Sequence, residues 1–363
     1  MHHRLQKNTL EKIINFQIFL IIILVGFCLL RFPSAVSSGI TKGLYLCSDV
    51  IIPSLFPFMV LSSFLVKSGF CEKFGFIFEP FTRTLFKLPG CTAGAIFMSL
   101  IGGFPVGAKM TYDLFENHQI TMNQARKMML FCINAGPAFV INAVGFSMLG
   151  SSKVGIILFA SLCFTSILIG IVISITETYE DLSPLFSSCD NCTPKKEKLT
   201  YALTNSVSDA AQSIFSVCVW VIFFSFIGAL VSLAPLSENT IISLNCIFEV
   251  TSGCNMAVNT FSIPMIAFIL GWAGLCVHCQ VLQYLNGVGV NMVYFFIARI
   301  ANATVASVIC ARLLEVFPCD VQTFSSNSLA FDAAFSVSAP AAAVLLIMSA
   351  LLILDLDTKQ EMC

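Results

Sequence analysis

A glycine- and proline-rich stretch, Ile101-Gly102-Gly103-Phe104-Pro105-Val106-Gly107-Ala108, lies within an uncharged window of 21 residues between Lys87 and Lys109. A window of this length can cross a bilayer, which needs about 20 apolar residues. Three glycines and a proline within six residues work against a continuous helix. Backbone groups that such a break frees at membrane depth must face protein or a watery cavity. The sequence therefore predicts a broken membrane helix here, a feature typical of solute sites in transporters.

The composition of the whole chain is that of a membrane protein. Hydrophobic residues make up 57% of the sequence and charged residues 11%, whereas soluble domains have about 25% charged residues. Uncharged windows recur at 13–30, 50–66, 88–108, 128–152, 154–176, 210–237, 250–298 and 333–354. We therefore predict an all-α, polytopic fold with about eight to ten membrane helices, including broken helices and re-entrant, hairpin-like segments. The net charge of −1 excludes a nucleic-acid binder, which needs a basic face for phosphates.

The N-terminus and one polar stretch suggest the domain boundaries. The apolar run 13–30 is longer than a signal-peptide core and lacks a small-residue cleavage site, so we predict an uncleaved first span. The charged, proline-containing stretch that begins at Glu177 is the predicted linker between two membrane halves. The predicted units are an N-terminal anchor span at 1–43, a first repeat at 44–176, a linker at 177–209, a second repeat at 210–354 and a polar tail at 355–363.

The two halves share an ordered spacing of an acid, a glycine break and an asparagine. Three pairs define the register: Glu79 with Glu249, Gly102 with Gly271, and Asn134 with Asn302. Secondary transporters are built from such repeats, with the solute site at the repeat interface near the midplane. We therefore expect discontinuous helices around both glycines, and hairpins or short half-spanning helices at 72–90 and 241–257.

The first break supplies candidate solute contacts. Gly102 and Gly103 would free backbone N–H groups, Phe104 and Pro105 would shape the wall, and a half-helix N-terminus there would favour an anion. Lys109 follows the break and has two interpretations. It extends to the membrane interface, or it pairs with an anionic solute or with Glu249.

A second interruption, Asn134-Ala135-Gly136-Pro137, brings an amide into an apolar window. An amide in hydrocarbon needs a partner, and its donor and acceptor can serve a ligand. The alternative is that Asn134 bonds to the backbone of a neighbouring helix. Asn302 occupies the corresponding place in the second half and carries the same two interpretations.

The second half contains the sequence Glu249-Val250-Thr251-Ser252-Gly253, in which a carboxylate precedes two hydroxyls and a glycine. This pattern can turn a re-entrant hairpin and coordinate a cation or a proton, so Glu249, Thr251 and Ser252 are candidate ligands. Arg299 follows 49 uncharged residues. It is expected to face a cavity or to pair with an acid, and Glu249 is the candidate partner.

Cysteine and histidine do not predict a metal centre. Cys189 and Cys192 have metal-ligand spacing in the polar stretch, but no second ligand pair is near them. Cys276, His278 and Cys279 are poorly placed to share one helical face, and a buried histidine with a satisfied partner is the plainer interpretation. We expect no cofactor. No nucleophile–base constellation and no P-loop is present, so we predict neither an enzyme nor a primary ATP-driven transporter.

Five motifs carry a resemblance to a known family: Pro53-Ser54-Leu55-Phe56-Pro57-Phe58, Phe78-Glu79-Pro80, Leu88-Pro89-Gly90, the stretch from Gly102 to Lys109, and Asn134-Ala135-Gly136-Pro137. They resemble the sporulation integral membrane protein family YlbJ, also called SpoVV, and the sequence from Glu249 to Gly253 resembles its second-half motif. The similarity extends from about residue 44 to about residue 315. This family belongs to the nucleoside-recognition, or gate, group, which is distantly similar to concentrative nucleoside transporters.

The resemblance implies a membrane carrier that moves a small anionic solute such as dipicolinate across the outer forespore membrane during spore formation. Two alternatives stay open: a carrier for a nucleoside or nucleobase, and a membrane assembly factor of the spore that transports nothing. The expected partners are the lipid bilayer and a small-molecule solute, with self-association an open alternative. The expected location is the cell membrane, or the outer forespore membrane in a sporulating host.

Overall fold

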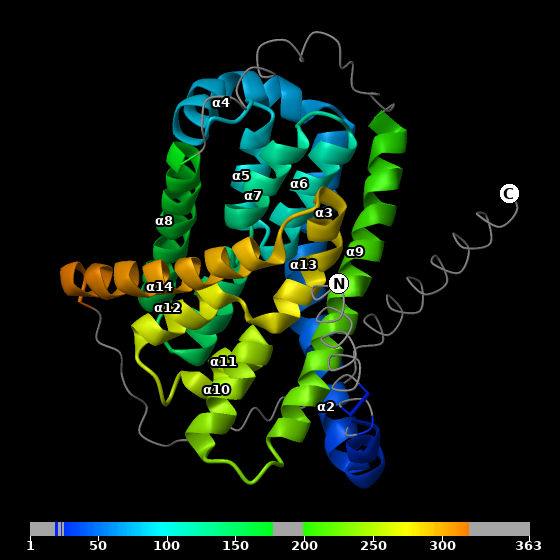
Figure 1. Ribbon diagram of the computed structural model, residues 1–363, viewed down its shortest axis with the longest axis vertical. Helices are drawn as coiled ribbons and strands as arrows, with labels where there is room; N and C mark the ends of the chain where they lie inside the picture. Colours follow the sequence, from blue (N-terminus) through cyan, green and yellow to red (C-terminus); the bar gives the residue numbers. More distant parts are fainter. Residues whose placement is uncertain (1–18, 21–22, 24, 177–198, 319–363) are drawn as a thin grey trace, which may run out of the picture.

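The computed structural model describes residues 19–20, 23, 25–176 and 199–318, and this part of the chain is helical, with no strand (Figure 1). Five helices in it are long and apolar enough to span a membrane: Pro33–Lys67, Ser152–Ile175, Leu199–Val231, Ile263–Val288 and Met292–Val316. The predicted all-α, multi-pass membrane fold is confirmed. Predictions for 1–18, 177–198 and 319–363, which include Cys189, Cys192, the window 333–354 and the polar tail, lie outside the described residues.

Two long elements form a unit that we call the arm. The first consists of α2 (Pro33–Leu46), the π-helix η1 (Cys47–Ile51) and α3 (Ile52–Lys67), and it packs along α9 (Leu199–Val231). Gly39 and Gly43 allow this contact, because a Cβ on them would lie 2.7 Å and 2.8 Å from backbone Cα atoms of α9. Two helices of the arm extend across the predicted domain boundaries. The first helix runs through the division at 43/44, and α9 already begins at Leu199 inside the predicted linker.

The segment 72–90, predicted as a hairpin or half-spanning helix, contains a single helix. Helix α4 (Phe70–Phe86) includes Pro80 without interruption and lies across one end of the bundle (Figure 1). Ile77, Phe78 and Phe81 are exposed on it, while Glu79 pairs with Arg83 one turn on, at 2.7 Å. The acid that sequence analysis matched to Glu249 is therefore on a surface helix.

The window 88–108 forms a helical hairpin instead of a broken span. Helix α5 (Thr92–Ile101) and helix α6 (Phe104–Glu116) turn back on each other at Gly102–Gly103. Gly103 has φ +90° and ψ 177°, a conformation that is essentially restricted to glycine. The two helices touch where a Cβ on Gly107 would lie 2.5 Å from the Cβ of Ser99. Such contact between residues eight apart requires a reversal of the chain.

A discontinuous helix and a long helix follow this hairpin. Helix α7 (Met122–Phe131) ends before the non-helical residues 132–136, and the π-helix η2 (Ala138–Met148) continues beyond them. The predicted interruption at Asn134–Pro137 is therefore observed. Helix α8 (Ser152–Thr176) packs back on η2.

The second half repeats this order. Helix α10 (Glu238–Phe248) and helix α11 (Val250–Ala257) form the hairpin predicted for 241–257, with Glu249 at its tip. Helices α12 (Ile263–Trp272) and α13 (Gly274–Val288) are the broken helix, and α14 (Met292–Val316) is the long one. The break lies at Ala273, with φ +73°, two residues after the predicted Gly271.

The repeat exists in a different register from the one that the sequence suggested. The observed order is hairpin, broken helix and long helix in each half, so the tip at Gly102–Gly103 corresponds to Glu249. The break around Asn134 then corresponds to the one at Ala273. The register suggested by the sequence was wrong by one element. It paired Gly102, at the tip of the first hairpin, with Gly271, which lies near the break of the second broken helix. We call the two hairpins, the two broken helices, α8 and α14 the core.

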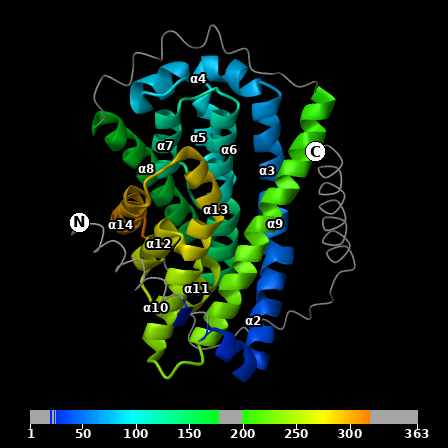
Figure 2. The same ribbon diagram turned by 45° about the vertical axis from the view of Figure 1, so that its right-hand side comes forward.

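The elements do not all run in one direction. In Figures 1 and 2 the arm, α5, α6 and α13 follow the long axis of the molecule, whereas α12 and α14 lie across it. The arm packs against one side of the core through α6 and α13. Both hairpin tips and both breaks consequently lie near the middle of the molecule.

Candidate functional site

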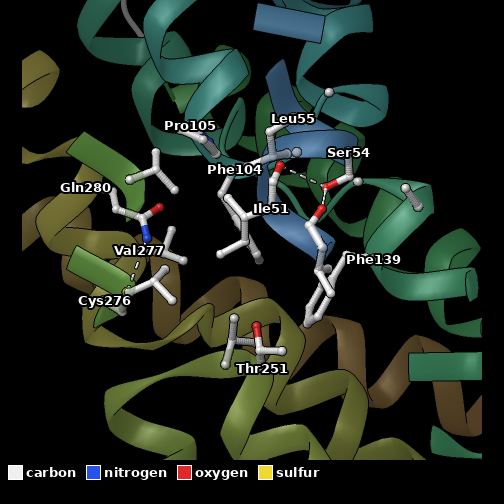
Figure 3. A pocket seen from close by; sticks show the side chains of 18 of the residues that line it. Ile51, Ser54, Leu55, Phe104, Pro105, Phe139, Thr251, Cys276, Val277 and Gln280 are labelled. Carbon is white, nitrogen blue, oxygen red and sulfur yellow. Dashed lines mark hydrogen bonds between the residues drawn. The ribbon is translucent and has the colours of Figure 1, made fainter. Parts of the chain in front are cut away.

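A cavity of about 70 Å³ lies between the arm and the core (Figure 3). The first half contributes residues 101–105, Gly136, Ala138 and Phe139, and the second half contributes 249–251, Cys276, Val277 and Gln280. The arm contributes Val50, Ile51, Ser54, Leu55, Val217 and Val221. Both hairpin tips, both broken helices and the arm therefore meet at one cavity, as expected for a solute site at a repeat interface.

In each half the hairpin tip rests on the break of the following helix. A Cβ on Gly136 would lie 3.1 Å from the amide nitrogen of Gly103, and a Cβ on Gly274 would lie 3.4 Å from the Cα of Glu249. Only a residue without a side chain allows such close backbone approach at these two points. The glycines therefore fix the position of the tips relative to the breaks.

Four half-helices begin at this cavity. Helices α6, η2, α11 and α13 start at Phe104, Ala138, Val250 and Gly274, and each places residues of its first turn in the wall. The first N–H groups of a helix have no partner within the helix, and its N-terminus carries about half a positive charge. Their convergence makes the backbone itself a source of positive potential in the cavity. Two π-helices, η1 and η2, also reach the wall, and π-helical turns are frequent at functional sites.

Glu249 neutralises one of these N-termini. Its side chain is 3% exposed, and its carboxylate accepts hydrogen bonds from the amides of Thr251 at 2.8 Å and Ser252 at 2.6 Å. The carboxylate thus caps α11 and shapes the hairpin tip. Glu249 and Thr251 line the cavity as the sequence predicted, whereas Ser252 lies behind them.

The polar side chains in the wall include two that sequence analysis missed. Ser54 donates to the carbonyl of Val50 at 2.5 Å, and Gln280 donates to the sulfur of Cys276 at 3.2 Å. Figure 3 shows both side chains and Thr251 around the open space. Gln280 could have been found only by placing the break at Ala273, because α13 then presents Cys276 and Gln280 one turn apart on one face.

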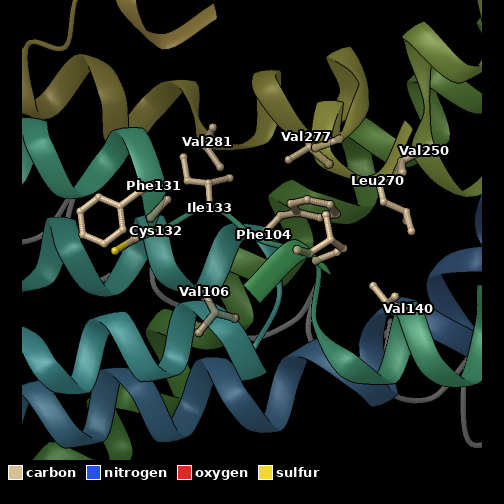
Figure 4. Packing of buried hydrophobic residues seen from close by; sticks show 14 of the residues in the cluster. Phe104, Val106, Phe131, Cys132, Ile133, Val140, Val250, Leu270, Val277 and Val281 are labelled. Atoms are coloured by element: carbon tan, nitrogen blue, oxygen red, sulfur yellow. The ribbon is translucent and has the colours of Figure 1, made fainter. Parts of the chain in front are cut away.

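Apolar side chains supply the remaining walls. Phe104 and Phe139 stand on the first turns of α6 and η2, and Val277 faces them from the second half. Figure 4 shows Phe104 near Val277, and Ile133 near Val281, within the buried apolar cluster. The combination of aromatic walls with backbone N–H groups suits a small planar solute with polar ends.

Lys109 does not line the cavity. Its ammonium lies 2.9 Å from a carboxylate oxygen of Asp113, one turn further along α6, and both side chains are largely buried. Glu249, the acid that sequence analysis suggested, is not its partner. Lys109 is therefore placed as half of an intrahelical ion pair.

We expect Lys109→Met to destabilise the protein by about 2–3 kcal/mol, because it leaves the Asp113 carboxylate largely buried without its cation. The double variant Lys109→Met/Asp113→Leu should regain most of that stability. Thermal unfolding of the purified variants in detergent measures the effect. If the double variant is stable but no longer binds dipicolinate, the lysine is a solute ligand after all and the ion-pair assignment fails.

The structure places Arg299 at the first break and away from Glu249. Its guanidinium donates to the carbonyls of Ile133 at 2.6 Å and Leu130 at 2.7 Å, and the side chain is fully buried. Leu130 is in the last turn of α7 and Ile133 lies in the break just after it, where a cation offsets the negative end of the helix. The suggested pairing of Arg299 with Glu249 is not observed, and its observed role is to hold the break.

The remaining predicted site residues take part in packing. Asn134 donates to the carbonyl of Phe131 at 3.0 Å and to the hydroxyl of Ser166 at 2.9 Å, which is the structural alternative. Gly271 lets α12 approach α14, since a Cβ there would lie 2.7 Å from the Cα of Ala303. Asn302 is buried on α14, and its amide nitrogen has no partner among the described residues. None of the three lines the cavity.

His278 agrees with the plainer interpretation of its motif. Its Nε2 donates to the carbonyl of Trp272 at 2.9 Å, at the end of α12, and its ring packs against Phe295 and Phe296. Within the described residues, no group of three or more histidine, cysteine or acidic side chains could hold a metal ion.

Comparison with known proteins agrees with this architecture. Residues 49–178 match the family model Gate, described as nucleoside recognition. The chain is also 26% identical over 313 residues to the sporulation integral membrane protein YlbJ of Bacillus subtilis (strain 168), an alignment that covers 76% of this chain and 77% of that protein. No solved structure matches. The resemblance that the motifs suggested is confirmed, and it extends across both halves.

Proposed function

We propose that this multi-pass membrane protein is a carrier for a small, planar, anionic solute such as dipicolinate. The observation that carries the proposal is the convergence of four half-helix N-termini on one cavity between the two halves. Within the part of the chain that the structure describes, three of them, those of α6, η2 and α13, have no side-chain cap, whereas Glu249 caps α11. Broken-helix N-termini that point at an anionic group are a recurring device of secondary transporters.

The geometry of the wall supports a dicarboxylate on an aromatic ring. The apolar side chains of Phe104, Phe139 and Val277 would cover the ring, while N–H groups at opposite N-termini would bind the two carboxylates. In this site, backbone dipoles would balance the charge of the solute, a role for which the sequence suggested Lys109 and Arg299. Binding charge through fixed dipoles avoids bringing a further charged side chain into the membrane.

A neutral nucleobase or nucleoside is the second candidate, and a specific observation favours it. Glu249 and Gln280 place a carboxylate and an amide in the same cavity, and these groups can pair with the edge of a heterocycle. The description of the matching family model, nucleoside recognition, points the same way.

The similarity to a sporulation protein supports a cellular setting for the carrier. We place it in the outer forespore membrane of a sporulating cell, or in the cell membrane of a host that forms no spores. The assembly-factor alternative would need no cavity between the halves, so the shared cavity favours a carrier over it. The proposal assigns no enzymatic step to the chain.

Counterflow in proteoliposomes tests the proposal. Vesicles loaded with unlabelled dipicolinate should accumulate labelled dipicolinate only when they contain the protein, and excess uridine should compete weakly. The variant Gln280→Leu should reduce uridine transport more than dipicolinate transport, since only the edge of the nucleobase would need the amide. Strong uridine counterflow with no dipicolinate counterflow would replace the anion with the second candidate. No counterflow of either solute would favour the assembly factor.

A further inference from the structure

A cluster of four charged residues, Lys67, Lys109, Asp113 and Asp209, lies where the arm meets the core, outside the cavity wall. Lys67 and Asp209 form an ion pair at 2.6 Å, and Lys109 and Asp113 form one at 2.9 Å. The two pairs are close enough for Asp209 and Lys67 to act electrostatically on Asp113. Charges in a membrane protein rarely gather without a functional reason.

The cluster is built on three helices that also line the cavity, α3, α6 and α9. On α6, Pro105 of the wall lies one turn from Lys109, and on α9 Val217 lies two turns from Asp209. On α3, Leu55 lies three turns from Lys67. A helical turn rises about 5.4 Å, and α3 runs along both α9 and α6 (Figure 2). The cluster therefore lies one to three turns beyond the cavity along its walls.

Each ion pair is contained within one of the two units. Lys67 and Asp209 both belong to the arm, on α3 and α9, and Ser63 of the arm adds a hydrogen bond to Asp209 at 3.4 Å. Lys109 and Asp113 both belong to α6 of the core. If the arm and the core moved apart here, neither of these two ion pairs would break.

A long hydrogen bond crosses the boundary at this level. The hydroxyl of Tyr284, on α13 of the core, donates to the hydroxyl of Ser213, on α9 of the arm, at 3.4 Å. Gln280 of the cavity wall lies one turn from Tyr284 on α13. The ring of Tyr284 packs beside that of Tyr112 on α6, with centroids 5.7 Å apart. Tyr284 therefore stands between the cavity and the ion pairs.

The cavity in this structure is small. Its volume of about 70 Å³ is well below the roughly 300 Å³ at the lower end of small-molecule sites. A ring with two carboxylates can enter only if the walls separate. Neither ion pair of the cluster crosses the arm–core boundary, so within the described residues separation there leaves both pairs intact.

We propose that the cavity is entered between α3 and α9 of the arm and α6 and α13 of the core, and that Tyr284, bonded to Ser213, closes this path. The two lysine–aspartate pairs line the outer part of this path and keep it polar, so that a charged solute loses its hydration water gradually as it enters. The solute class rests on the proposed function, but the path itself does not.

Reaction of Cys276 with methyl methanethiosulfonate, followed by peptide mass spectrometry on the purified protein, measures entry to the cavity without any solute. Cys276 lines the cavity and is 1% exposed, so its labelling requires opening. Tyr284→Phe and Ser213→Ala each remove the crossing bond and should raise the labelling rate about 2- to 10-fold. The double variant should label no faster than either single variant, because both lose the same bond.

Tyr112→Phe is the matched control. Its hydroxyl donates to Glu116 within α6 at 2.7 Å, so its loss should leave Cys276 labelling unchanged. Cys310, fully buried on α14 and outside the cavity wall, reports general loosening and should stay unreactive in every variant. An unchanged Cys276 rate in Tyr284→Phe and Ser213→Ala, or an equal rise at Cys310, would overturn the proposed path. Faster Cys276 labelling with no solute counterflow would retain the path and reject the carrier function.

Discussion

The variant Gly107→Ala should lower the stability of the protein far more than the same substitution at the unpacked Gly26. A Cβ at this position would collide with the carbonyl oxygen of Cys132 and lie 2.5 Å from the Cβ of Ser99 and 3.0 Å from its Cα. These atoms belong to α5 and to the break after α7, so relief requires the backbone to move. We expect a loss of about 3 kcal/mol and a fall in melting temperature on the order of 5–10 °C.

Gly26→Ala is the control for this prediction. No heavy atom lies within 4 Å of a Cβ built on Gly26, so the added methyl group meets open space. Its melting temperature should stay within about 2 °C of the unsubstituted protein. Equal melting temperatures for the two variants would show that α5 and α6 do not pack as a hairpin.

Glu249→Gln should leave membrane insertion intact and reduce solute flux about 10-fold or more. The carboxylate accepts two backbone amides at the hairpin tip, whereas the glutamine side chain has one acceptor oxygen and turns two donors toward the other amide. A charge-assisted hydrogen bond contributes about 1.5–3 kcal/mol, so the tip would lose its fixed position in the cavity wall. Counterflow in proteoliposomes measures the flux, and membrane yield measures insertion.

Glu238→Gln provides the comparison. Glu238 is an exposed acid in the first turn of α10, at the far end of the same hairpin, and its substitution should change flux less than 2-fold. Normal flux in Glu249→Gln would mean that transport needs neither the charge of Glu249 nor its two hydrogen bonds to the hairpin tip. The carboxylate would then not be part of the solute site.

The sequence was sufficient to predict the kinds of element but not their connections. Glycine and proline at 102–105, and again at 136–137, predicted interruptions because local backbone chemistry decides where a membrane helix can stop. Whether the chain reverses or continues after an interruption depends on what it packs against. Residues 101–108 reverse because Gly107 fits against Ser99, a contact that no pattern along the chain reveals.

The site was predicted in part, for the same reason. Residues at the tips, including Gly103 and Glu249, were found because an acid or a glycine pair within an apolar window is conspicuous. Lys109 and Arg299 were assigned to the solute because their partners were unknown. The partners, Asp113 for Lys109 and the carbonyls of Leu130 and Ile133 for Arg299, became evident only from the packing. Gln280 was missed because nothing in the sequence placed the second break before it.

Backbone amide exchange on addition of dipicolinate is the most direct test of the central claim, that uncapped helix N-termini at this cavity bind an anion. Hydrogen–deuterium exchange should slow at the first turns of α6, η2 and α13, and stay unchanged in α2 at the outer end of the arm. Gly103, Phe104 and Ala138 are the amides expected to gain most protection. Protection confined to other parts of the chain, or none at saturating dipicolinate, would contradict the claim.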